Sequence, residues 1–195
     1  MKNGRIPRDE RKSVEFTSNL RIVNVVATTQ IGRKVDLVKV GEHQDGSYSD
    51  RTYRGNAAYI KSKRMKGKVT VFGNGKLISV GTKSEAQARS DIMTACRVLV
   101  EVGVDIPDKP KVTLQNIVAT GELGKRIEIE RLASRFPDVL YEPEQFPGAI
   151  YHAVELKGAS VLVFASGKVV FAGLKDSQHL EEAEKVLKKL GKAFS

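Results

Sequence analysis

The chain repeats itself. Two short phrases, NVVAT at 24–28 and VFGNGK at 71–76, recur as NIVAT at 116–120 and VFASGK at 163–168. Each phrase returns 92 positions later without a gap (24 to 116, 71 to 163), and so do Gly81 and Lys83. A register kept over so long a stretch indicates two structural copies of one unit. Two copies of about 90 residues are too few and too long for a solenoid, so we expect a pair of pseudo-symmetric half-domains.

Length and composition limit the alternatives. A chain of 195 residues with 41% hydrophobic content can bury one substantial core or two small fused ones. No segment approaches 18 consecutive apolar residues and the N-terminus has no apolar signal region, so we expect no membrane contact and a cytoplasmic location, or a nuclear one if the cell has a nucleus. The single Cys96 lies at helical spacing with Ile92 and Leu99, which predicts a small buried side chain.

Net charge favours a polyanionic partner. The formal charge is +10 and the pI about 9.7, and nucleic acid is the commonest polyanion in the cytosol. Part of the excess lies in 2–12 and in KVLKKLGK at 185–192, where it also fits a solvated arm or helix face. We expect a flexible basic N-terminal arm at 1–16, a first repeat at 17–103, a linker at 104–110 and a second repeat at 111–195.

Apolar periodicity predicts the same elements in each copy. Alternation around Asn24 and around Asn116 predicts a strand. A helix follows Gly124, with apolar residues from Ile129 to Phe136 at helical spacing. Further strands are expected around 57–62, 68–72, 76–81, 149–154, 160–164 and 168–173. A final helix closes each copy, beginning after Ser84 in the first and at Asp176/Ser177 in the second.

This order predicts an α+β fold in which each half is an antiparallel sheet with its helices on one face. In SVLVFASGKVVFAG the two strand faces are both apolar. Val161 and Val163 then face the helices, while Leu162 and Phe164 point away from them. An uncovered apolar sheet face of this size is typical of a binding surface. A second sheet or a partner chain covering it remains an alternative.

Four phrases resemble the TATA-binding protein family of general transcription factors: RIVNVVATTQIGRKVDL, YEPEQFPGAIY, LVFASGKVVFAG and VFGNGKLISVGTKS. The resemblance extends over about 17–190. It implies a saddle whose concave face enters the minor groove of DNA, and this family is itself a known example of proteins that kink DNA there. We therefore expect A·T-rich promoter DNA as the ligand, transcription factor B as a protein partner and RNA polymerase as an indirect one.

The resemblance assigns DNA contacts to both copies. The minor groove offers mainly hydrogen-bond acceptors, so a protein that reads it needs few polar groups and much apolar contact. Asn24 and Asn116 supply the amides, and phenylalanines at the sheet ends supply wedges that unstack base steps. The remaining contacts are apolar groove fillers or phosphate ligands. The expected set is Asn24, Val26, Phe72, Lys76, Ile78, Val80, Asn116, Val118, Phe146, Phe164, Ser166, Lys168, Val170 and Ala172, with Asn74 beside Lys76.

The first copy departs from the family pattern. GEHQDGSYSDRTYRGN replaces the usual acidic-proline-phenylalanine loop, and the gapless register puts Arg54 where Phe146 has its mate. One wedge of four is then missing. Three alternatives are open: Arg54 enters a narrow groove, Arg54 holds a phosphate, or Tyr53 replaces the wedge. Val80 and Ala172 also stand where the family has threonine. We expect an asymmetric saddle.

Other functions are weighed beside this one. Glu142 and Glu144 match the family's contact with transcription factor B. A divergent paralogue that regulates through protein contacts, a saddle that grips an RNA–DNA hybrid, and a homodimer of the free protein are alternatives. The three histidines have no ligand spacing and GNGK lacks the full phosphate-loop pattern, so we expect no metal, no cofactor and no enzymatic activity.

Overall fold

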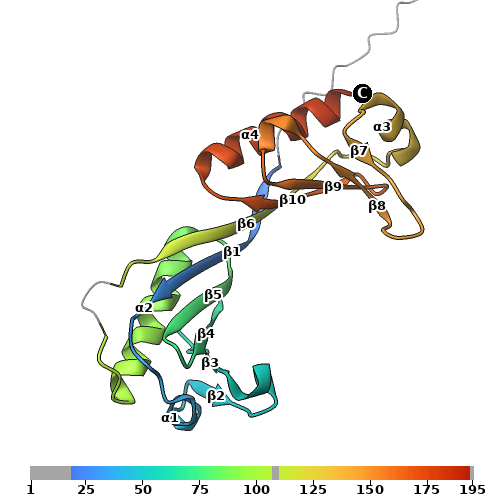
Figure 1. The fold of residues 1–195 in the computed structure, drawn as a ribbon. Helices are drawn as coiled ribbons and strands as arrows, with labels where there is room; N and C mark the ends of the chain where they lie inside the picture. The colour runs from blue at the N-terminus through green and yellow to red at the C-terminus, as the bar shows by residue number, and fades with distance from the viewer. Residues whose placement is uncertain (1–18, 107–109, 194–195) are drawn as a thin grey trace, which may run out of the picture.

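One antiparallel sheet of ten strands runs through both copies in the computed structural model, which describes residues 19–106 and 110–193 (Figure 1). The strand order is β2-β3-β4-β5-β1-β6-β10-β9-β8-β7. The first copy contains β1 (Arg21–Gln30), α1 (Leu37–Glu42), β2 (Gly46–Tyr48), β3 (Ala57–Ile60), β4 (Lys68–Phe72), β5 (Lys76–Thr82) and α2 (Glu85–Glu101). The second contains β6 (Thr113–Glu122), α3 (Ile129–Arg135), β7 (Val139–Leu140), β8 (Gly148–Tyr151), β9 (Ser160–Phe164), β10 (Lys168–Leu174) and α4 (Ser177–Ala193).

The repeat predicted from the sequence governs the architecture. Both bounds of β1, β4, β5 and α2 recur 92 positions later in β6, β9, β10 and α4. The strand order also reads the same from either end of the sheet, with β1 and β6 at its centre. The predicted α+β saddle of two half-domains is therefore confirmed. The expected arm at 1–16 lies outside the described residues, and the limits of the two repeats stay a prediction.

The long helices cover one face of the sheet. In Figure 1, α4 lies over the outer face of the second half and α2 over that of the first, while the inner face opens toward the opposite side. Val161 and Val163 are fully buried on the helix side, whereas Leu162 and Phe164 are half-exposed on the other. The alternation thus sorts the side chains as predicted. No helix in 19–106 or 110–193 is long and apolar enough to span a bilayer.

Capping side chains begin both long helices where the sequence predicts. The Ser84 hydroxyl accepts the backbone N–H of Gln87 at 3.2 Å, and the Asp176 carboxylate accepts that of His179 at 2.9 Å. Each acceptor satisfies a donor that the first turn leaves without an intrahelical partner. The N–H of His179 is also the main cause that lowers the pKa of the Asp176 carboxyl.

The repeated phrase Phe-x-x-Gly-Lys forms the β4–β5 and β9–β10 hairpins. Gly75 and Gly167 have φ of 83° and 86°, and their N–H groups donate to the carbonyls of Phe72 and Phe164. A Cβ at Gly75 would lie 2.2 Å from a backbone carbonyl oxygen, and one at Gly167 would lie 2.0 Å from another. Both the positive φ and the close approach require glycine, which explains why this part of the phrase is kept in both copies.

The gapless register is wrong in the outer strands. Tyr59 pairs with Thr70, whose side chain is on the inner face, but Tyr151 pairs with Val161 on the helix side. Strand β8 is therefore shifted by one residue relative to β3, and a shift of one residue moves side chains to the opposite face. Tyr59 lies beneath the Nζ of Lys68, 4.0 Å from the ring centroid, whereas Tyr151 is buried. The short strands β2 and β7 were not predicted.

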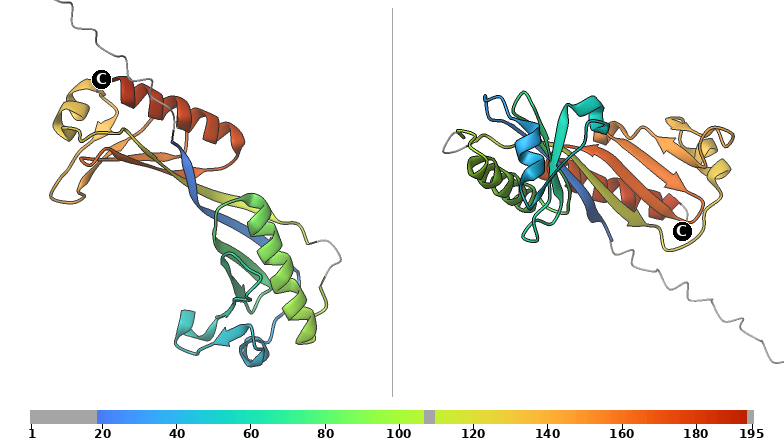
Figure 2. Two further views of the ribbon diagram at one scale, coloured as in Figure 1. Left: turned by 180° about the vertical axis from the view of Figure 1, so that it is seen from behind. Right: turned by 90° about the horizontal axis from the view of Figure 1, so that it is seen from below.

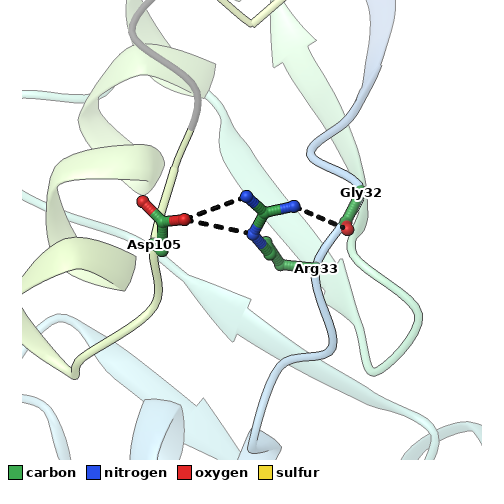
Figure 3. Close-up of polar contacts among 3 residues, drawn as sticks. All are labelled: Gly32, Arg33 and Asp105. Carbon is green, nitrogen blue, oxygen red and sulfur yellow. Dashed lines mark hydrogen bonds and ion pairs between the residues drawn. The ribbon is translucent and has the colours of Figure 1, made fainter.

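An ion pair holds the segment after α2 against the loop after β1. Arg33 donates to Asp105 from Nε at 3.2 Å and from the terminal nitrogen at 2.9 Å, and it also donates to the carbonyl of Gly32 (Figure 3). Both charged side chains are more than half exposed. Such exposed pairs contribute about 0 to 1 kcal/mol to folding. The contact therefore positions the segment more than it stabilises the fold.

A polar atom is trapped under α2. The Ser79 side chain is fully buried, and its hydroxyl has no hydrogen-bond partner among the described residues. We expect Ser79→Ala to raise the free energy of unfolding by about 1 kcal/mol, because it removes an unsatisfied group, and to raise Tm by about 2–4 °C. Thermal unfolding followed by circular dichroism measures this. Ser90→Ala on the exposed side of α2 is the control, and a lower Tm for Ser79→Ala would contradict the assignment.

Candidate nucleic-acid interface

Two asparagines and two valines form the centre of the inner face. In the antiparallel β1–β6 pair, Asn24 lies opposite Val118 and Val26 lies opposite Asn116. The four side chains thus alternate around the pseudo-two-fold axis. All four are half-exposed, which places polar and apolar groups together on an accessible surface.

The hydrogen bonds of the asparagines define which way each amide points. The Oδ1 of Asn24 accepts the N–H of Gly81 at 2.8 Å, and the Oδ1 of Asn116 accepts that of Gly173 at 3.0 Å. Because the glycine N–H is a donor, the atom of the amide that faces it must be the oxygen. The two N–H groups of each Nδ2 are therefore left to bind a ligand. Neither Nδ2 has a partner among the described residues. The inner face therefore presents donors at its centre.

Apolar side chains surround these donors. The expected groove fillers on β5 and β10 are half-exposed on the same face as the asparagines. They are Ile78, Val80, Val170 and Ala172. Together with Val26 and Val118 they make a continuous apolar surface with few polar groups, which suits a groove that offers acceptors and little else.

Bulges bend the sheet beside each asparagine. Gly81 has φ of 86° and Gly173 has φ of 98°, and the pairing of the adjacent strands shifts register at both positions. A bulge with a left-handed glycine bends its strand and increases the local twist. The same glycines donate the N–H groups that hold the asparagines, so curvature and amide orientation have one source.

At the second-copy end, two phenylalanines form a ring pair. The centroids of Phe146 and Phe164 lie 5.7 Å apart with an interplanar angle of 63°. Phe164 ends β9, and Phe146 lies in the turn before β8. Both are half-exposed, which is unusual for rings that serve only a core.

At the first-copy end, Tyr53 forms the matching pair. Its ring lies 5.7 Å from that of Phe72 with an interplanar angle of 65°. The gapless register put Arg54 at the place of the fourth ring, but the residue whose ring pairs with Phe72 is its neighbour Tyr53, one of the three alternatives left open. Tyr53 is 61% exposed, with φ of 47°, and Arg54 has φ of 54°. Backbone strain of this kind in residues other than glycine often accompanies functional sites.

The expected phosphate contacts lie at the hairpins between the rings and the sheet edge. Lys76 and Lys168 are exposed at the start of β5 and β10. The side chains of Asn74 and Ser166 accept the backbone N–H groups of these lysines, at 3.1 and 3.4 Å, so they stabilise the turns. The two lysines follow Phe72 and Phe164, one member of each ring pair, by four residues.

An acidic pair precedes Phe146 in the same loop. Glu142 and Glu144 are exposed in the turn after β7, and the carbonyl of Glu142 accepts the N–H groups of Gln145 and Phe146. The turn that presents the acidic groups therefore also supports the phenylalanine. Glu142 and Glu144 are the acidic groups nearest in sequence to Phe146.

Some inner-face residues were outside the expected set. Thr28 and Thr120 follow the asparagines by the same alternation, and Leu162 lies beside Val170. Strand parity alone identifies these three. The Tyr59–Lys68 contact required the shifted register and had no signal in the sequence. Among the residues that the structure describes, no group of three or more His, Cys, Asp or Glu side chains could hold a metal ion.

Comparisons with known proteins agree on one family. The family model "Transcription factor TFIID (or TATA-binding protein, TBP)" matches residues 19–102 and 111–193. The TATA-box-binding protein of Cenarchaeum symbiosum is 38% identical over 84% of this chain and 88% of its own length, and that of Archaeoglobus fulgidus 36% identical over 84% and 90%. The solved structure of Methanococcus jannaschii TBP superposes with a TM-score of 0.73 at 34% identity, covering 90% of this chain and 97% of that one.

Proposed function

This chain belongs to the TATA-binding protein family, and we propose that it is a general transcription initiation factor that binds A·T-rich promoter DNA in the minor groove. The pair of asparagines carries the proposal. Each amide oxygen is occupied by a glycine N–H, so each side chain offers only donors to a ligand. The minor-groove edges of A·T and T·A pairs present only acceptors, at adenine N3 and thymine O2.

We propose further that the ring pairs kink the DNA at both ends of the saddle. Inserting a ring between base steps costs about a few kcal/mol of stacking and opens a bend that brings more sheet into contact. Phe146 and Phe164 act at one end, and Tyr53 and Phe72 at the other. Lys76 and Lys168 would neutralise phosphates beside the kinks, because both are exposed next to the rings.

The acidic turn is proposed as the contact for transcription factor B, through which RNA polymerase is recruited. Glu142 and Glu144 are exposed in the loop before β8. They suit a basic surface on that partner. We propose no catalytic role for the chain.

The test is binding and bending of a fluorescent duplex that carries an A·T-rich site. We expect binding to an A·T-rich duplex with a large bend, and much weaker binding to a G·C-rich duplex, where the guanine amino group projects into the minor groove. Circular-permutation gels or energy transfer between the duplex ends measure the bend. Equal affinity for the two duplexes, or for an RNA–DNA hybrid, would contradict the proposal.

The regulatory alternative is favoured by one observation, the divergent loop before β3. It predicts weak DNA binding together with retained binding of transcription factor B. The ring pair formed by Tyr53 lessens the support for this alternative, because it restores aromatic contact at that end. A gel-shift assay with and without transcription factor B separates the two functions.

Tyr53 and Arg54 can be distinguished experimentally. We expect Tyr53→Ala to weaken DNA binding about tenfold and to reduce the bend, because stacking on a base is worth about 1–3 kcal/mol. Tyr53→Phe should retain both properties. Arg54→Ala is the neighbouring control: it should keep the bend and, if the guanidinium holds a phosphate, lower the slope of log K against log salt by about 0.9. A reduced bend in Arg54→Ala alone would contradict the role of Tyr53.

A further inference from the structure

The outer faces of the two equivalent helices differ in chemistry. The difference is clear at three equivalent positions. Helix α2 has Met93, Cys96 and Val100 where α4, 92 positions later, has Lys185, Lys188 and Lys192. The α4 face is a solvated row of lysines. The α2 face is apolar, and Val100 is 57% exposed there. The two helices, equivalent in the repeat, therefore present different chemistry on their outer faces.

A depression of about 390 Å³ lies along this apolar face. Its lining includes Met93, Cys96 and Val100 from α2, and Ile106 from the segment beyond the helix. Figure 2 shows this segment running beside α2 on the outer side of the first half. The Arg33–Asp105 ion pair holds the segment there. Burial raises the pKa of the Cys96 thiol to about 11, so the thiol is neutral and adds to the apolar surface.

A second depression, of about 410 Å³, adjoins the first, and Arg97 and Glu101 line both. Its far side is the loop between β3 and β4, from which Lys63 and Arg64 contribute. Glu101 is engaged by His43, whose Nε2 lies 2.9 Å from its carboxylate. We call the two adjoining depressions together the α2 groove. The first is mainly apolar, and the second is lined by three cations (Lys63, Arg64 and Arg97) and two carboxylates (Asp45 and Glu101).

The loop that makes the basic end is rigidly held. The buried carboxylate of Asp91 accepts the N–H groups of Lys66, at 3.1 Å, and Gly67, at 2.6 Å. The ammonium group of Lys61 donates to the carbonyls of residues 65, 66 and 67. Within 61–68, KSKRMKGK, all five Lys and Arg side chains are exposed. A fixed loop presents its charges without the entropic cost of ordering them on binding.

The cations of the groove are available to a ligand. The side chains of Lys63, Arg64 and Arg97 form no ion pair with any residue in 19–106 or 110–193. Around them, residues 19–106 contain 15 Lys and Arg against 8 Asp and Glu, a net +7, whereas 110–193 contain 12 against 11, a net +1. The field at this groove therefore attracts negative groups, and the equivalent place in the second half does not.

We propose that the α2 groove docks an acidic, amphipathic segment of a partner protein, whose apolar side chains pack on Val100 and whose carboxylates pair with Arg64 and Arg97. The groove lies on the helix side of the sheet, opposite the inner face, so the segment and DNA bind at the same time. Flanking DNA is not the occupant, because minor-groove wedges bend the duplex toward its major groove and away from the protein. Residues 1–18 do not suit it either, since they carry five basic and three acidic residues.

Fluorescence anisotropy with synthetic peptides tests the proposal. The probe is a labelled helix-forming peptide of about four turns, with leucines at i, i+3, i+4 and i+7 and glutamates on the remaining face. One comparison peptide has lysine in place of every glutamate, and a second has the same composition in scrambled order. Val100→Lys copies the residue of α4, and Arg64→Glu reverses the charge at the basic end. The control is Val154→Lys, the same substitution at an exposed valine outside the groove.

We expect the acidic amphipathic peptide to bind the natural chain at least tenfold more tightly than either comparison peptide. Val100→Lys and Arg64→Glu should each weaken it about tenfold, and Val154→Lys should not. Saturating A·T-rich duplex should leave the peptide affinity unchanged, and all three variants should still bind that duplex. No saturable binding up to about 1 mM, equal binding of the lysine peptide, or no effect of Val100→Lys would overturn the proposal.

The proposal would also be overturned if the natural chain were a dimer and the Val100→Lys variant a monomer. A second copy of the chain would then occupy the groove. Analytical ultracentrifugation of the natural chain and the variant measures this. The peptide and ultracentrifugation results do not depend on the DNA-binding proposal. That proposal fails only if the natural chain does not prefer the A·T-rich duplex.

Discussion

The Asn116→Asp protein should bind an A·T-rich duplex at least about a hundredfold more weakly than the natural chain, while its Tm stays within a few degrees. Aspartate has the shape of asparagine, and its carboxylate can still accept the N–H of Gly173, so the fold keeps its contact. The Nδ2 donor, however, is replaced by an anionic oxygen that faces adenine N3 and thymine O2. An unpaired polar group in a closed interface costs about 1–3 kcal/mol, and more when it is charged.

A matched control tests whether DNA binding is weakened by the position of the new negative charge or by the negative charge alone. Gln178→Glu makes the same change from amide to carboxylate on α4, on the outer face, and should leave DNA affinity nearly unchanged. Asn24→Asp should reproduce the loss, because Asn24 makes the equivalent bond to Gly81. Titration of a labelled duplex at one fixed salt concentration gives the affinities. If Asn116→Asp and Gln178→Glu bound equally well, the asparagine would not contact the bases.

The second large effect is expected for Phe164→Ala. Removing this ring takes away one member of the pair with Phe146, so the base step at that end should remain stacked. We expect about a tenfold to hundredfold loss of affinity, since each stacked base is worth about 1–3 kcal/mol, together with a smaller bend. Energy transfer between dyes at the two duplex ends measures the bend and the affinity in one titration.

Phe136→Ala is the control for loss of an aromatic ring. Phe136 is also half-exposed, but its ring packs on Tyr151 with the centroids 5.4 Å apart, at the end of α3. It should lower stability without changing the bend. Equal affinity and equal bend for the Phe164→Ala protein and the natural chain would exclude the wedge mechanism, whatever the result for Asn116→Asp.

Periodicity and repetition predicted the parts of the fold that depend on local patterns. The strands around Asn24 and Asn116, the caps at Ser84 and Asp176, and the glycine hairpins follow from side-chain alternation and backbone rules, which act over a few residues. The identity of the inner face followed from the same alternation. These are features for which neighbouring residues in the chain contain all the information needed.

The remainder depended on contacts between segments far apart in the chain. The sequence left Tyr53 as one of three alternatives for the fourth ring and could not select it, because its position against Phe72 requires left-handed backbone at two residues that are not glycine. The shift between β3 and β8 is set by the length and shape of the preceding loops. The α2 groove also escaped prediction, since it joins a helix to a loop that precedes it by about 30 residues in the sequence.

The alternation of Asn24, Val118, Asn116 and Val26 about the central axis limits what this protein can sense. A surface that looks the same after half a turn fits a site equally well in either direction along the double helix. Any preference for one direction must therefore come from inner-face residues that differ between the halves: Ile78 against Val170, Val80 against Ala172, and the ring of Tyr53 against that of Phe146. On the proposed function, the direction of transcription would then depend on these few unlike pairs, because the four central side chains present the same pattern in both directions.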